Sequence, residues 1–226
     1  MRLDKFLTEC GIGTRREVKD IITKDVVTIN NKRVSSPKEK VDLGKDVVKI
    51  RETILEYKEN RFYVLNKVAG FITATEDPKE KTVMELLPKW VNKKDLFPVG
   101  RLDKDTEGLL LFTNNGKIAH ELLSPKKHVN KTYLVKLLKE IDEKSVKLLE
   151  EGVDIGGYVT KPSKVQIINN TEIFLTISEG RFHQVKKMLE SVENKVTYLK
   201  RLQFGKLKLG DLPLGEVKEV TLTDIF

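Results

Sequence analysis

Apolar residues recur at helical spacing in two stretches near the start of the chain. The first stretch ends at Gly11 and Gly13. The second opens on Thr14 with Glu17 three residues later, a capping-box pattern that marks a helix N-terminus. The sequence therefore predicts two short helices, with apolar faces formed by Leu3, Phe6, Leu7 and Cys10 in the first and by Val18, Ile21 and Ile22 in the second.

A β-hairpin is predicted directly after these helices. Residues 26–29 form a short apolar run, Asn30 and Asn31 favour a tight turn, and residues 32–34 return as a second strand. The highly charged stretch 44–60 predicts one strand, from Asp46 to Ile50, followed by a linker.

From residue 61 onward, strand and helix patterns are mixed. Strands are predicted at 62–65, 109–113, 132–138, 163–168, 173–177 and 196–202, with a hairpin turn at 169–171. Helices are predicted at 82–87, 117–123, 143–151 and 182–190. Because strands and helices do not alternate strictly, the pattern indicates an α+β fold with a mixed, mostly antiparallel sheet. We expect a small domain with its linker at 1–59 and a larger domain at 60–226.

The composition indicates the charge of the binding partner. The 226 residues carry a formal net charge of +8, and 39% of them are apolar, which is enough for a core. A basic balance of this size favours an anionic partner such as nucleic acid. The alternative is a soluble protein whose many lysines are only solvated.

Several classes of site and location are not expected. Cys10 is the only cysteine, so no internal disulfide and no cysteine metal cluster is expected. None of His120, His128 and His183 has metal-ligand spacing to another histidine or to the cysteine, so we expect no metal site. The absence of a long apolar run and of an apolar signal region predicts no membrane association and a cytoplasmic location.

Three segments carry candidate chemistry. The first, Val-Gly-Arg-Leu-Asp-Lys-Asp-Thr-Glu-Gly at 99–108, places Asp103 at a glycine-rich turn before a buried-looking strand, where a single carboxylate can be rigid yet reachable. The second is Asn-Lys-Thr-Tyr-Leu-Val at 130–135. The third is Glu-Gly-Arg-Phe-His-Gln-Val-Lys-Lys at 179–187, a glycine turn that opens a basic helix.

Together these segments resemble the motifs of the pseudouridine synthases, namely Gly-Arg-Leu-Asp, Lys-Thr-Tyr and Gly-Arg-x-His-Gln-Val-Lys/Arg. The resemblance implies isomerisation of a uridine in RNA to pseudouridine. That reaction breaks the bond between C1′ and N1, turns the uracil and rejoins it through C5. It needs no metal, cofactor or redox step.

The resemblance also implies roles for individual residues. Asp103 acts at the sugar, either by attacking C1′ or by removing a proton beside it. Tyr133 packs on the uracil and takes the C5 proton, and Lys186 pairs with Asp103 and keeps it ionised. The motifs further imply substrate-binding roles for Arg101, which enters the RNA stack in place of the flipped base, and for Arg181 and Gln184.

Each of these residues has a plain structural alternative. Asp103 could merely cap its turn, Tyr133 could be an ordinary half-buried strand residue, and Lys186 could lie on an exposed helix face. Arg101 could form an ion pair with Asp105 or Glu107. A further segment, Asn-Lys-Val-Ala-Gly at 66–70, resembles the family's Asn-Lys-Pro-x-Gly, with Val68 at the usual proline.

The first domain resembles the small RNA-binding domain first named for ribosomal protein S-four. The matching features are Arg-Leu-Asp-Lys at the start, Thr-Arg-Arg before the second helix, and the hairpin. This resemblance implies contacts with RNA phosphates through Arg15, Arg16, Lys19, Lys32 and Arg33. The alternative is a solvated basic face.

The motifs are most similar to the branch of the family that modifies small-subunit 16S rRNA. We therefore expect an rRNA pseudouridine synthase, acting as a monomer on ribosomal RNA or on an assembling ribosomal particle. The same chemistry on 23S rRNA is a second hypothesis. A non-catalytic RNA-binding assembly factor is a third, although such a protein would not need Asp103, Tyr133 and Lys186 together.

Overall fold

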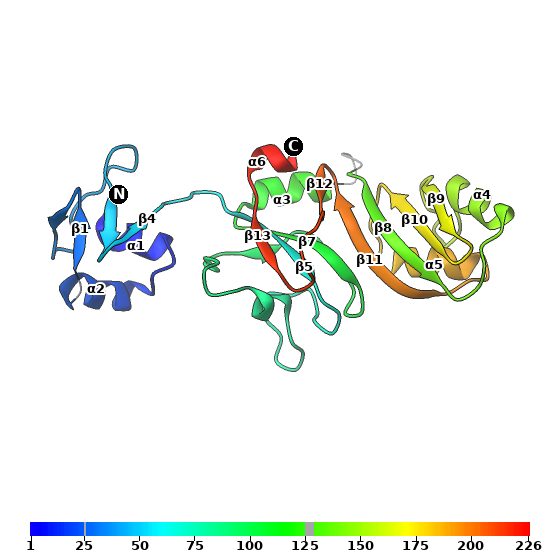
Figure 1. Ribbon diagram of the computed structural model, residues 1–226, viewed down its shortest axis with the longest axis horizontal. Coiled ribbons are helices and arrows are strands. Elements are labelled where there is room, and N and C mark those ends of the chain that lie inside the picture. Colours follow the sequence, from blue (N-terminus) through cyan, green and yellow to red (C-terminus); the bar gives the residue numbers. More distant parts are fainter. Residues whose placement is uncertain (25, 125–128) are drawn as a thin grey trace. The chain divides into compact units, whose positions relative to one another are not determined.

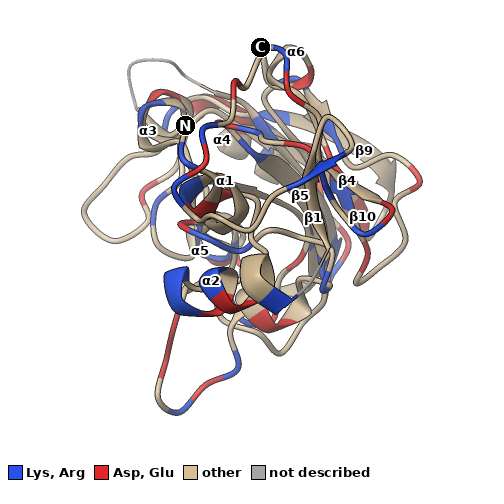
Figure 2. Ribbon diagram, turned by 90° about the vertical axis from the view of Figure 1, so that its left-hand side faces the viewer, with Lys and Arg blue, Asp and Glu red and all other residues tan. Residues whose placement is uncertain are grey.

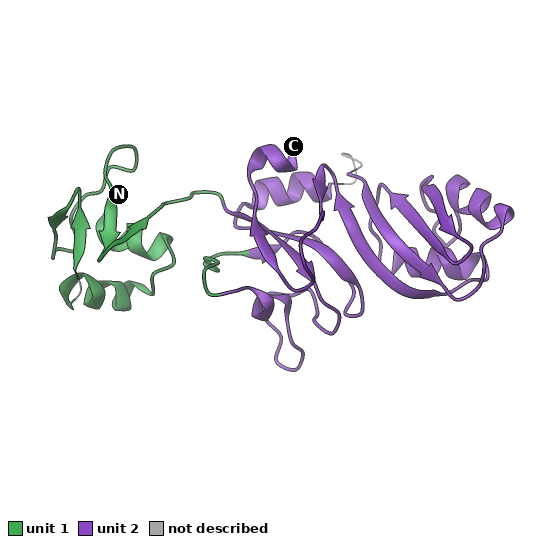
Figure 3. Cartoon of the chain, in the orientation of Figure 1, with its two compact units in different colours: residues 1–60, 89–96 green, residues 61–88, 97–226 purple. Residues whose placement is uncertain are grey.

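The computed structural model describes residues 1–24, 26–124 and 129–226; His128 lies outside these ranges. These residues form two compact units, one made of 1–60 with 89–96 and the other of 61–88 with 97–226 (Figure 3). Each unit is described by itself below.

The first unit begins with the two predicted helices, α1 (Leu3–Glu9) and α2 (Arg15–Lys24). The capping box is confirmed, because the Glu17 N–H donates to Thr14 Oγ1 (3.3 Å) and the Thr14 N–H donates to Glu17 Oε2 (2.7 Å). The predicted apolar faces meet the sheet in one core. Its buried members are Leu3, Phe6, Leu7, Val18, Ile22, Val27, Ile29, Val41 and Val48.

A four-stranded antiparallel sheet completes this unit, in the order β2-β1-β3-β4. Its strands are β1 (Val27–Ile29), β2 (Lys32–Arg33), β3 (Val48–Ile50) and β4 (Thr53–Leu55). The hairpin turn is confirmed, since Asn30 and Asn31 have positive φ values of 51° and 64°, which asparagine tolerates. The prediction of only a linker after β3 was wrong. β4 is an exposed edge strand, and the charges around it masked the pattern.

Residues 89–96 also belong to the first unit. The Asn92 Nδ2 group donates to the Glu9 carbonyl (2.7 Å), and Lys94 Nζ lies 2.9 Å from Glu9 Oε2. Gly11 faces the same segment, because a Cβ at this position would lie 2.6 Å from the Asn92 side chain. Interactions of this kind, far apart in sequence, leave no local pattern.

The second unit is built on a nine-stranded sheet. Seven strands follow the order β13-β5-β7-β11-β8-β10-β9, while β6 pairs with β7 and β12 with β11. Among the strand pairs that the described residues form in this sheet, only β7–β11 is parallel, so the predicted mostly antiparallel α+β fold is confirmed. The strands are β5 (Phe62–Lys67), β6 (Phe97–Pro98), β7 (Glu107–Thr113), β8 (Lys131–Leu137), β9 (Lys164–Asn169), β10 (Glu172–Ile177), β11 (Val196–Phe204), β12 (Leu207–Lys208) and β13 (Val217–Glu219).

The helices of this unit are α3 (Gly116–Leu123), α4 (Glu143–Glu151), α5 (Gln184–Ser191) and α6 (Leu222–Ile225). Figure 1 shows α4 beside β9, at the opposite end of the unit from α3 and α6. The stretch predicted as a helix at 82–87 is the 3-10 helix η1 (Val83–Leu86). The predicted start of α5 at Phe182 was wrong, because His183 takes a left-handed conformation and the helix opens at Gln184.

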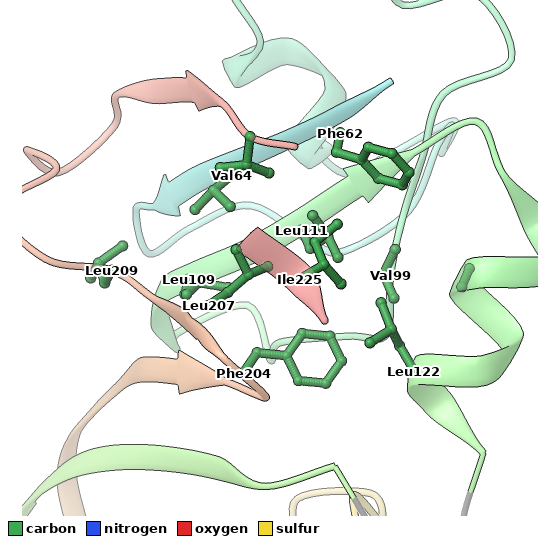
Figure 4. Packing of buried hydrophobic residues seen from close by; sticks show 12 residues of the cluster. Phe62, Val64, Val99, Leu109, Leu111, Leu122, Phe204, Leu207, Leu209 and Ile225 are labelled. Carbon is green, nitrogen blue, oxygen red and sulfur yellow. The ribbon is translucent and has the colours of Figure 1, made fainter. Parts of the chain in front are cut away.

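One hydrophobic core joins the sheet to α3 and α6. Figure 4 shows Phe62 and Val64 of β5, Leu109 and Leu111 of β7, and Phe204 of β11 packed near Leu122 and Ile225. This core lies under the strand that follows Asp103, and it anchors the strand's backbone. Among the described residues, no helix combines the length and apolar character that crossing a membrane requires.

Candidate active site

The loop between β6 and β7 carries Asp103. On its N-terminal side Leu102 is buried, its N–H donates to Thr73 Oγ1 (3.1 Å), and the Thr73 hydroxyl donates back to the Leu102 carbonyl (2.7 Å). On the other side Thr106 is buried, and its N–H donates to the Asp103 carbonyl (3.1 Å). The backbone is thus fixed on both sides, while the Asp103 side chain remains 26% exposed.

Lys67, at the end of β5, holds the same loop from within the unit. Its fully buried Nζ donates to the carbonyls of Thr106 (2.8 Å), Val68 (3.1 Å), Asp103 and Lys104 (3.2 Å each). Burial lowers the pKa of Lys67 to about 8, against the raising effect of the carboxylates nearby. The valine that replaces the usual proline at position 68 takes part in this network through its carbonyl.

Replacing Lys67 with methionine should destabilise the second unit. The change removes the Lys67 donor from the carbonyls of Thr106 and Val68, whereas those of Asp103 and Lys104 keep a backbone N–H donor. We expect the free energy of unfolding to fall by about 2–4 kcal/mol. Urea denaturation would measure the decrease. Lys104→Met on the same loop is the matched control, because Lys104 is 51% exposed and its pair with Glu80 is at the surface. Equal stability of the two variants would show that the hydrogen bonds of Lys67 are not needed to hold the loop.

Lys186 reaches two carboxylates of the loop. Its Nζ lies 3.2 Å from Asp103 Oδ2, and 2.7 and 2.9 Å from the two carboxylate oxygens of Asp105. Burial would lower the pKa of Lys186, but hydrogen bonds to Asp105 and Asp103 raise it overall. Burial has the opposite effect on a carboxylate and would raise the pKa of Asp105, but the hydrogen bond and the charge of Lys186 lower this pKa overall. The cluster therefore holds a charged lysine between two carboxylates; the sharing with Asp105 was not predicted.

His183 lies near the other carboxylate oxygen of Asp103. Its Nε2 lies 3.6 Å from Asp103 Oδ1, and its ring stacks on Phe182 with a centroid separation of 3.8 Å. The backbone φ of His183 is 52°, a left-handed value that is uncommon outside glycine but that histidine adopts more often than most residues. Unfavourable backbone geometry of this kind is concentrated at functional sites.

Gln184 and Arg181 belong to one hydrogen-bonded network. Gln184 is buried, its Nε2 group donates to Glu179 Oε1 (2.8 Å), and its Oε1 accepts from the Arg181 N–H (2.9 Å). Glu179 also accepts from the Tyr158 hydroxyl (2.8 Å), and the Arg181 guanidinium lies 3.3 Å from the centre of the Tyr158 ring. Both ends of the Gln184 amide are therefore engaged within the protein, whereas the Arg181 side chain is exposed and lies over the Tyr158 ring.

Tyr133 lies inside a cavity of about 720 Å3 that Asp103 and Lys186 also line. It stands on β8 between Leu175 of β10 and Arg201 of β11, and it is 7% exposed. The fold thus brings together residues of three distant segments, as the motifs suggested.

Two basic residues near Tyr133, Lys131 and Arg201, were missed as site residues by sequence reasoning. Arg201 is 2% exposed, its Nε donates to the Leu109 carbonyl (2.8 Å), and its Nη2 has no hydrogen-bond partner among the described residues. Burial, followed by the charge of Arg201, lowers the pKa of Lys131 to about 8. Both residues line the cavity, and their signal in the sequence was a basic residue within an apolar strand pattern.

The charge of the cavity lining is predominantly positive. The lining contains two carboxylates, those of Asp103 and Glu179. Its basic side chains are more numerous: Arg101, Lys104, Lys131, Lys161, Arg181, Lys186 and Arg201. Arg101 is exposed, and among the described residues it forms no ion pair with Asp105 or Glu107. Asp105 binds Lys186, and Glu107 accepts from the Tyr198 hydroxyl (2.6 Å). A cavity of this composition suits an anionic chain that brings one group to a carboxylate.

The other predicted RNA contacts lie in the first unit. Arg15 and Arg16 are exposed in the first turn of α2, and Lys32 and Arg33 are exposed on β2. Figure 2 shows charges of both signs along α2, so the helix is not uniformly basic. The structure therefore gathers six predicted residues around the cavity of the second unit (Asp103, Tyr133, Lys186, Arg101, Arg181 and Gln184), whereas Arg15, Arg16 and Lys32 belong to the first unit.

Comparison with known families matches the model described as RNA pseudouridylate synthase over residues 61–191 and the S4 domain over residues 1–48. The chain belongs to the RNA pseudouridylate synthase family. It is therefore an isomerase that carries an RNA-binding S4 domain ahead of its catalytic domain.

Relatives of this pseudouridine synthase match along the whole chain. An uncharacterised RNA pseudouridine synthase of Bacillus subtilis is 47% identical, covering 98% of this chain and 95% of the relative. The ribosomal small subunit pseudouridine synthase A of Escherichia coli is 36% identical (100% and 98%), and the ribosomal large subunit pseudouridine synthase B of Bacillus subtilis is 33% identical (97% and 92%). A solved structure, a crystal structure of pseudouridylate synthase, is 34% identical with a TM-score of 0.69 (100% and 98%).

Proposed function

We propose that this enzyme converts a uridine of ribosomal RNA to pseudouridine and that Asp103 is the residue acting at the sugar. One observation carries the assignment of the site: the Asp103 carboxylate is paired with Lys186 in a cavity that Tyr133 also lines. We further propose that the enzyme works as a monomer in the cytoplasm, on rRNA or on an assembling ribosomal particle, without a cofactor.

In this proposal each of these residues has one role in the reaction. Asp103 acts at the ribose as the bond between C1′ and N1 breaks. In one route its carboxylate attacks C1′, and the bond between Asp103 and C1′ breaks again when C5 bonds to C1′. In the other route the carboxylate removes a neighbouring sugar proton and returns it at that same step. The uracil then turns against the ring of Tyr133, C1′ bonds to C5, the C5 proton leaves, and N1 gains a proton. The flat ring and polar hydroxyl of Tyr133 suit it to hold the base and accept that proton.

The basic lining offsets the energy of base flipping. Removing a uridine from its stack costs a few kcal/mol, and phosphate contacts supply a compensating interaction. Arg101 is exposed at the cavity and has the planar guanidinium that stacks on bases. It is our candidate for the side chain that replaces the flipped base.

The S4 domain supplies further phosphate contacts in this proposal. The double substitution Arg15→Ala and Arg16→Ala should weaken RNA binding and reduce the slope of log Kd against log salt by about one unit for each phosphate that is no longer neutralised. Fluorescence anisotropy over a salt series measures both quantities. The matched control is Lys144→Ala with Lys147→Ala, which removes the same charge from exposed positions of α4. Identical slopes for the two double variants would remove the arginines from the interface.

The 16S rRNA is the preferred target because the motifs are most similar to the small-subunit branch. The 23S rRNA is the second candidate, supported by the 33% identity with a large-subunit enzyme. The two targets share the chemistry and differ in the RNA contacts.

Pseudouridine mapping tests the proposal. Unmodified 16S and 23S rRNA, and immature ribosomal particles, are incubated with the enzyme, treated with carbodiimide and read by primer extension. We expect one enzyme-dependent stop in 16S rRNA. A stop in 23S rRNA alone would overturn the target and keep the chemistry, and no stop on any substrate would overturn the assignment to ribosomal RNA.

A further inference from the structure

Phe182 is an apolar ring that the protein leaves open beside its catalytic cavity. Phe182 lies in the loop before α5, between Arg181 and His183 in sequence. Its side chain lines the cavity and is 66% exposed. Single exposed apolar residues are common on protein surfaces, so exposure alone carries no function. The functional inference rests on the residues that surround this ring.

The ring is held in place on one side. It stacks on the His183 imidazole with centroids 3.8 Å apart and planes inclined by 18°, and that imidazole lies 3.6 Å from Asp103. Lys187 Nζ lies 5.7 Å from the ring centroid. An aromatic ring with basic neighbours is the arrangement on which unpaired bases stack.

Phe182 packs against little of the rest of the protein. With two thirds of its surface exposed, it contributes little to the core, which lies instead under Val185, Met188 and Leu189 of α5. The left-handed backbone at His183 places the Phe182–His183 pair ahead of the helix rather than on its buried face. Truncation of the ring should therefore leave the stability of the enzyme nearly unchanged.

We propose that Phe182 is a stacking platform for the nucleobase next to the target uridine. This inference rests on the proposed function. When the target uridine leaves its stack, each neighbouring base loses a stacking partner, and an aromatic side chain can replace it. The target uracil itself belongs deeper in the cavity, against Tyr133, which is 7% exposed. The exposed ring of Phe182 can therefore stack on the base next to the target uridine.

A thermodynamic cycle between protein and RNA tests the inference. The RNA is an rRNA fragment containing the uridine found by mapping, made intact or with an abasic nucleotide on the 5′ or the 3′ side of the target. Phe182→Ala should weaken binding of the intact fragment by roughly 5- to 100-fold. The same substitution should change affinity little when the stacked neighbour is abasic, and the side that gives this result identifies the base.

Two control variants sharpen the cycle. Phe182→Trp should keep the affinity of the wild type, and Phe226→Ala should not change it, because Phe226 is an exposed aromatic residue (42%) outside the cavity. An equal decrease in affinity on all three RNAs, or no decrease on the intact one, would overturn the inference. If the wild-type enzyme forms pseudouridine while the cycle shows no coupling, this inference alone fails; absence of pseudouridine in all rRNA substrates would instead be the failure of the proposed function.

Discussion

Replacing Asp103 with asparagine is expected to abolish pseudouridine formation. Asparagine has nearly the same shape as aspartate, but it has neither the charge to attack C1′ nor the basicity to remove a proton beside it. The loop should keep its conformation, because Lys67 binds the backbone carbonyl of Asp103 rather than its side chain. We expect the single-turnover rate to fall by more than about 10³-fold, with RNA affinity within a few-fold of the wild type.

Asp105→Asn is the matched control for this change. It removes one carboxylate from the same loop, yet it leaves Asp103 paired with Lys186. We expect this variant to retain most of the turnover. Pseudouridine formation by the Asp103→Asn variant at a comparable rate would end the assignment of Asp103 and leave the family membership untouched.

Local patterns accounted for much of the fold. The capping box at Thr14 and the Asn30–Asn31 turn depend on residues that are neighbours in sequence, so their chemistry is readable directly. The main strands of the second unit followed from continuous or alternating apolar runs. Short edge elements such as β4 were missed because exposed strands carry no burial pattern.

The site required information that no local pattern holds. Asp103, Tyr133 and Lys186 come from three segments, and only the resemblance to a family suggested that they meet. The fold does bring them to one cavity, Asp103 from the loop before β7, Tyr133 from β8 and Lys186 from α5. The missed residues, Lys131 and Arg201, are basic side chains that lie partly or fully buried in the sheet, whereas sequence reasoning places such side chains at the surface unless a tertiary interaction is known.

The position of α5 shows how backbone conformation limited the prediction. The apolar periodicity predicted that Phe182 belongs to the helix. The left-handed backbone of His183 interrupts the helical conformation, so the rings of Phe182 and His183 both precede the first helical residue, Gln184. A conformation of this kind depends on the groups around it, here the stack with Phe182 and the approach to Asp103. The sequence pattern therefore missed the feature on which the stacking proposal depends.

Replacing Lys186 with methionine should reduce the rate of chemistry far more than RNA affinity. Lys186 is the cation between Asp103 and Asp105, and its raised pKa keeps it charged at neutral pH. Without it two nearby carboxylates have no shared counter-charge, and Asp103 is deprived of the ion pair that aims it. We expect the single-turnover rate at saturating enzyme to fall by about 10²- to 10³-fold, in the range found when one preorganised electrostatic interaction is removed.

Two comparisons separate this role from binding to a phosphate. Lys186→Arg should recover much of the rate, because a guanidinium can span the same two carboxylates. Lys187→Met removes the neighbouring positive charge, which lies near the Phe182 ring, and should leave the rate largely intact. If Lys186→Met instead weakens RNA binding with an unchanged rate at saturation, then Lys186 binds the RNA backbone, and Asp103 needs no cation from α5 to act at the sugar.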